Sequence, residues 1–183
     1  MKLINDNLKK TGIFNSILIV IALALRLMNI GKMPIIALVD ALINVIALLC
    51  GLLYSLNGYK KDVAKYYKAF MCLYALGSLI SFISPLRRFG FSPTNQTNLV
   101  HIIHFVVLVC TCLLALVKDF GEHNSKATAL VLLVMNGVIL VNDLISGAIV
   151  DVDYVSLSIF VQAIITYVLV SQKYADKEFR GAK

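Results

Sequence analysis

The stretch KATALVLLVMNGVILVNDLISGAIV, residues 126–150, decides the fold of this chain. After its opening lysine it runs for 24 almost entirely apolar residues, and a helix needs about 20 to cross a bilayer. Two asparagines and an aspartate nevertheless lie well inside the run: Asn136, Asn142 and Asp143. Helical spacing puts Asn136 and Asp143 on one face. A carboxylate at that depth is costly against lipid, so we expect this face to turn toward other helices or a water-filled cavity.

The composition of the whole chain agrees with a membrane-embedded protein. Of its 183 residues, 60% are hydrophobic and 15% are charged, and the mean hydropathy is +0.86. Soluble domains have nearer half apolar residues and about a quarter charged residues. We therefore expect an all-α, polytopic membrane protein that forms a single domain over residues 1–183.

Six runs are long and apolar enough to be transmembrane helices, and short polar connections join them. They are expected at residues 13–30, 34–57, 69–85, 98–117, 127–150 and 154–171. They form three consecutive hairpins, so the two termini lie on one side of the membrane. The segment 86–97 is expected to be a loop because it contains glycine, proline and small polar residues. The basic start before the first run also fits a signal peptide, which is the alternative to a first span.

Lysine and arginine are distributed unevenly between the two sides. Thirteen of them fall in the amino terminus, the connections 58–68 and 118–126, and the carboxyl-terminal tail. The opposite side has three, Lys32, Arg87 and Arg88. The positive-inside rule then predicts cytoplasmic termini, in what we expect to be a bacterial plasma membrane. The basic segments should contact anionic lipid, and nucleic acid is not an expected partner.

Four of the runs place an ionisable residue at nearly the same depth. Counted from the outer ends at about 1.5 Å per residue, these side chains lie roughly 6–10 Å into the membrane. Each run contributes a polar stripe, and we expect these stripes to face a shared interior. The candidates for a substrate- or ion-binding site are Asp143, Asp40, Arg26, His104, His101, Asn44, Asn136 and Asn142. Further polar stripes are formed by Tyr74, Ser78 and Ser81 on the third run and by Ser158, Gln162 and Thr166 on the sixth.

Each candidate also has a purely structural interpretation. Arg26 could reach the membrane surface, pair with Asp40 or Asp143, or hold an anion. His101 and His104 lie one turn apart and form a weak candidate pair for a metal, although hydrogen bonding within the bundle is the simpler interpretation. No cofactor or metal is expected. The asparagine, serine and threonine stripes could serve only as hydrogen bonds between helices.

Two classes of function fit these features. One is the binding or transport of a small solute or ion through a polar site in the outer half of the bundle, by a homodimer or with a partner membrane subunit. The alternative is an accessory or regulatory subunit whose polar residues only hold the helices together. No phosphate-binding loop, metalloprotease motif or nucleophile elbow is present, so the sequence does not indicate an enzyme. A serine–histidine pair within the membrane remains an open alternative.

Overall fold

The apolar runs all form α-helices, because in lipid a helix satisfies the hydrogen bonds of its own backbone. The computed structural model describes residues 2–28, 35–57, 64–89, 96–117, 120–145 and 154–181. Within these residues there are six α-helices and no strand, which confirms the all-α prediction. The helices are α1 (Lys2–Leu27), α2 (Ile35–Asn57), α3 (Ala64–Phe89), α4 (Gln96–Leu116), α5 (Glu122–Ile145) and α6 (Tyr154–Gly181).

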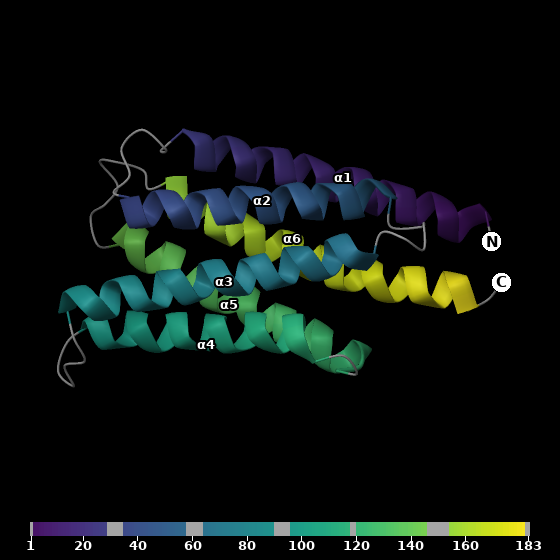
Figure 1. Ribbon diagram of the computed structural model, residues 1–183. Helices are drawn as coiled ribbons and strands as arrows, with labels where there is room; N and C mark the ends of the chain where they lie inside the picture. Colours follow the sequence, from purple (N-terminus) through teal and green to yellow (C-terminus); the bar gives the residue numbers. More distant parts are fainter. Residues whose placement is uncertain are drawn as a thin grey trace.

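The helices alternate in direction (Figure 1), and their contacts close a ring in chain order. Each helix packs against its neighbours in the sequence, and α6 returns to pack against α1. The start of α1 and the end of α6 lie at the same end of the bundle, which we call the terminal end (Figure 1). A closed ring gives every helix one inward and one outward face, so inward polar stripes can meet near the axis.

The outward faces of the helices carry exposed apolar side chains. Ile17 on α1, Ile46 on α2 and Leu130 on α5 are each at least half exposed. Five helices contain a stretch long and apolar enough to cross a membrane, and the apolar part described for α4 is the shorter segment Ile102–Leu116. Soluble monomers rarely expose large apolar surfaces, whereas helices that face lipid do so along their outer faces. The protein is an integral membrane protein.

The helices extend beyond the predicted spans at several ends. The first helix begins at Lys2, and α6 continues through its charged tail to Gly181. The third helix runs from Ala64 to Phe89, so residues 86–89 are helical rather than part of the predicted loop. Helical hydrogen bonding does not stop where hydropathy falls, and transmembrane helices tolerate an internal proline such as Pro85. The predicted end of the first span at residue 30, the start of the second at residue 34 and the last part of the fifth, residues 146–150, fall outside the described residues.

Small residues allow the helices of the ring to approach one another closely. Where α1 meets α6, the Ser158 hydroxyl donates to the backbone carbonyl of Ala22 at 3.1 Å, and both residues are fully buried. Close approach through small residues and interhelical hydrogen bonds is how helices associate in lipid, where neighbouring hydrocarbon gives no hydrophobic driving force.

A second polar contact joins α1, α2 and α6 nearer the terminal end. The Asn15 amide donates to Ser55 Oγ at 2.8 Å, and the Gln172 amide donates to the Ser55 carbonyl at 3.4 Å. Gly12 lies against the same carbonyl, and a Cβ at this position would clash with the Ser55 backbone oxygen. The contact therefore depends on glycine at position 12.

Candidate functional site

Arg26 ends the inward face of α1 and is almost completely buried. Its side chain is 2% exposed, and Nη1 lies 3.6 Å from Oδ2 of Asp40 on α2. The side chain therefore does not reach the membrane surface. An isolated arginine in this setting would be costly, so the nearby carboxylate accounts for its position.

Asp40 belongs to a closed circuit of polar contacts between α1, α2 and α6. Asn44, one turn along α2, donates through Nδ2 to both the carbonyl and Oδ1 of Asp40, each at 2.9 Å. Gln162 Nε2 donates to Asn44 Oδ1 at 2.9 Å, and Arg26 Nη2 reaches Gln162 Oε1 at 3.5 Å. Four side chains from three helices thus hold one another in place. We call Arg26, Asp40, Asn44 and Gln162 the polar circuit.

Gly77 on α3 allows that helix to lie directly against the polar circuit. A Cβ built at this position would fall 2.6 Å from Asn44 Nδ2 and 3.1 Å from Asp40 Oδ1. The first distance is shorter than real Cβ contacts, so Asn44 would have to move, and the second is a tight contact. Glycine is therefore the residue that lets the α3 backbone close the ring at this level.

Beside the polar circuit lies a cavity of about 30 Å³. All six helices contribute to its lining, which places it in the interior of the ring. The volume has room for about two water molecules, since one needs roughly 10–15 Å³. Its polar lining residues are Arg26, Asn44, Tyr74, Ser78, Ser81, His104 and Asn136.

The Tyr74 hydroxyl is a buried polar group at this cavity that the surrounding residues satisfy poorly. It lies near Arg26 and beside the side chain of Asn136, with which it makes at most a weak hydrogen bond, and no group around it meets ordinary hydrogen-bond geometry. Two neighbouring donors are used within their own helices: Ser78 Oγ donates to the Tyr74 carbonyl at 2.9 Å, and Asn136 Nδ2 donates to the Leu132 carbonyl at 2.8 Å. A buried hydroxyl without a partner is energetically unfavourable, so an occupant that accepts its hydrogen bond would stabilise the bundle.

The structure brings together most of the candidate residues predicted from the sequence. Arg26, Asp40 and Asn44 are in direct contact, and His104 and Asn136 line the cavity with them. Asn142 is half-buried and is not among the residues that line the cavity. The side chains of Asp143 and His101 lie outside the described residues, so their predicted roles stay predictions.

The described residues include no group of three histidine, cysteine, aspartate or glutamate side chains arranged to hold a metal ion. The candidate metal pair of His101 and His104 involves one side chain that the structure does not describe.

Gln162 and Tyr74 lie on polar stripes predicted from the sequence but were not among the predicted site residues, and no role was predicted for Gly77. Two helical spacings indicate inward faces: seven residues from Gln162 to Leu169 and four residues from Tyr74 to Ser78. All four residues are buried. Spacing along one helix does not say which residue of another helix will be opposite. The contact between Gln162 and Asn44, 118 positions apart, has no signal in a single sequence.

Comparison of the chain with protein-family models, with curated proteins and with solved structures gives no match. The site is therefore interpreted from its own geometry.

Proposed function

We propose that this integral membrane protein binds a small inorganic anion in the cavity beside the polar circuit, as a step in moving that ion across the membrane. The observation that carries the proposal is the cavity itself, which all six helices line and into which the Tyr74 hydroxyl brings an unsatisfied donor. A buried hydroxyl that Asn136 satisfies poorly favours an occupant that accepts its hydrogen bond.

The charge and size of the lining favour an anion over other occupants. Arg26 lines the cavity, Asp40 does not, and none of the described lining residues is acidic. The ion pair of Arg26 with Asp40 at 3.6 Å is longer than an optimal charged hydrogen bond of about 2.7–2.9 Å. A volume of about 30 Å³ suits a single small ion, and a larger solute would require the helices to separate.

The proposal can be tested by the thermal stability of the purified protein in a neutral detergent. Sodium chloride and sodium nitrate should raise the melting temperature in a saturable way, relative to sodium gluconate at equal ionic strength. Ligand at a hundred times its Kd stabilises the folded state by about 2.7 kcal/mol. The Tyr74→Phe variant should lose most of this effect. Tyr167→Phe is the matched control, because Tyr167 is partly buried on α6 and does not line the cavity.

A structural role is the second candidate function, and the polar circuit is the observation that favours it. Asp40, Asn44 and Gln162 bond one another, so these residues could lock α2 to α6 without any ligand. In that case no anion would change the melting temperature, and Tyr74→Phe would behave like Tyr167→Phe. This outcome would overturn ion binding and support an accessory or regulatory subunit.

A further inference from the structure

A second and larger pocket lies at the terminal end of the bundle, away from the polar circuit. Its volume is about 230 Å³, and the ends of α2, α4 and α6 and the start of α3 form its walls. Two lysines and two tyrosines line it, together with the apolar end of α4. No aspartate or glutamate is among its described lining residues. A binding site of this composition is suited to a negatively charged and partly apolar ligand.

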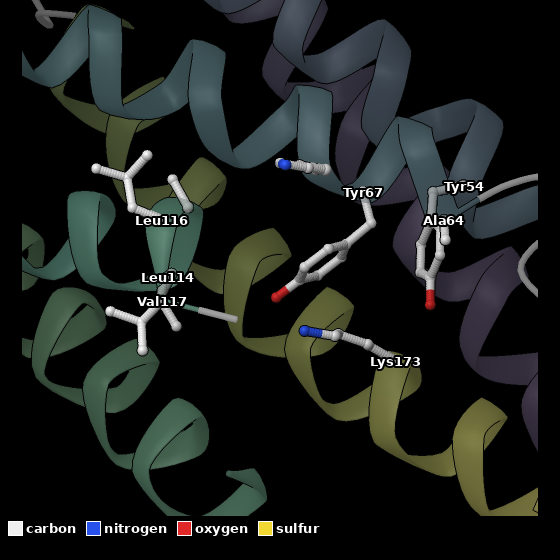
Figure 2. Close-up of a pocket in the computed structure, with 9 residues that line it drawn as sticks. Tyr54, Ala64, Tyr67, Leu114, Leu116, Val117 and Lys173 are labelled. Atoms are coloured by element: carbon white, nitrogen blue, oxygen red, sulfur yellow. The ribbon is translucent and has the colours of Figure 1, made fainter. Parts of the chain in front are cut away.

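Aromatic contacts hold the polar wall of the pocket in place. The Lys173 ammonium lies 4.7 Å from the ring centroid of Tyr67, and the Tyr67 and Tyr54 rings are 5.5 Å apart. Figure 2 shows the Tyr67 hydroxyl and the Lys173 ammonium pointing into the same space, toward the end of α4. Lys68, one residue after Tyr67, adds a second ammonium to the lining. A lysine ammonium held over an aromatic ring has less conformational freedom before any ligand binds, so less entropy is lost when it binds an anion.

The opposite wall is apolar and faces outward. Leu116 and Val117 at the end of α4 are 71% and 42% exposed. The apolar stretch of α4 ends at Leu116, and the span on α2 ends at Asn57, so the pocket lies where the helices leave the membrane. Tyrosine and lysine are the residues expected at this boundary, where headgroups replace hydrocarbon. A ligand here can place its charge against the lysines and its chain against Leu116 and Val117.

We propose that this pocket binds the phosphate headgroup of an anionic phospholipid. The ammonium groups of Lys68 and Lys173 and the hydroxyl of Tyr67 would hold the phosphate, and Leu116 and Val117 would contact the first part of an acyl chain. We assign a lipid rather than a soluble phosphate because only a lipid has an apolar chain that can contact the apolar wall. The site does not depend on the cavity beside the polar circuit, so the two proposals can succeed or fail separately.

Native mass spectrometry of the protein released from neutral detergent tests this site. Phosphatidylglycerol should bind with one preferred site, more tightly than phosphatidylcholine of the same chain length. Each lysine near a membrane surface contributes about fivefold in affinity for anionic lipid, so Lys68→Gln should weaken binding about fivefold. Lys68→Gln with Lys173→Gln should weaken it by more than tenfold. Lys126→Gln is the control, because Lys126 is a partly exposed lysine outside the pocket that pairs with Glu122.

Three results would overturn the assignment. Equal binding of the two lipids would show that the lysines do not select charge. Unchanged phosphatidylglycerol binding by both lysine variants would show that the lipid binds elsewhere. Equally tight binding of glycerol phosphate, measured by calorimetry, would show that the site takes a soluble phosphate. Lys68→Gln keeps the test informative if loss of Lys173 impairs folding, because Lys68 is exposed.

Discussion

The guanidinium of Arg26 lies 3.6 Å from the carboxylate of Asp40, within the membrane-spanning part of the bundle. The two side chains are 2% and 13% exposed, so water screens their interaction only weakly. Either charge alone would be unfavourable at this depth, and the attraction between the two offsets part of the cost of removing them from water. The pair joins α1 to α2 across a connection that the structure does not describe, and Gln162 extends it to α6.

Replacing Asp40 with asparagine should strongly destabilise the bundle, because Arg26 would keep its charge without the carboxylate. We expect a loss of about 3–5 kcal/mol, measured as a lower melting temperature in detergent. Arg26→Gln should cost a similar amount, and the double variant should cost less than the sum of the two. Additive losses would contradict the pair.

The exposed pair of Lys126 and Glu122 provides the matched control for this experiment. Its charged atoms are 2.6 Å apart, closer than those of Arg26 and Asp40, but both side chains are more than a third exposed. Solvent-exposed pairs one turn apart contribute at most about 0.5 kcal/mol. Glu122→Gln should therefore leave the melting temperature almost unchanged.

Gly77→Ala should destabilise the protein although alanine is the better helix former. The added carbon would fall 2.6 Å from Asn44 Nδ2 and force α3 away from the polar circuit, at a cost of about 1–3 kcal/mol. Gly137→Ala is the control, because its added carbon would meet only the edge of the Phe160 ring at 3.3 Å. Equal effects of the two variants on the melting temperature would show that α3 does not pack as described.

Gly12→Ala should weaken the packing of α1 against α2 near the terminal end. Its added carbon would meet the backbone carbonyl of Ser55, which cannot rotate away as a side chain can. We expect a loss at the upper end of about 1–3 kcal/mol. Urea or heat denaturation of the detergent-solubilised variant measures it, and a stability equal to that of the wild type would contradict the close approach.

The orientation predicted from the basic residues can be measured by cysteine labelling of intact cells. In a background without the four native cysteines, Thr94→Cys should react with a membrane-impermeant maleimide added outside. Glu122→Cys should react only after the cells are opened. The positive-inside rule predicts this pattern, and the reversed pattern would refute cytoplasmic termini.

The fold could be predicted from the sequence because hydropathy along a helix reports directly on burial in lipid. The inward direction of Asn44 and Asn136 was also predictable, since polar residues in a span avoid hydrocarbon. The estimated depths of the side chains in the membrane left two possible partners for Arg26, Asp40 and Asp143. To choose between these two residues, one must know which helices are neighbours in the ring.

Features that depend on contacts between distant helices had no sequence signal. The pocket at the terminal end brings Lys68 together with Lys173, and the clearance at Gly77 is set by side chains on another helix. The loop predicted from residue 86 was wrong for residues 86–89, which are helical. Hydropathy marks where a helix leaves the membrane, whereas the hydrogen bonds that define α3 continue to Phe89.

The central claim is that the cavity beside Tyr74 holds a small anion, and anomalous diffraction from crystals grown in sodium bromide tests it most directly. The account predicts an anomalous peak in the cavity within hydrogen-bonding distance of the Tyr74 hydroxyl, facing Arg26. The peak should disappear in Tyr74→Phe crystals grown under the same conditions. Bromide sites found only on the protein surface, with the cavity empty or filled by water, would contradict the claim.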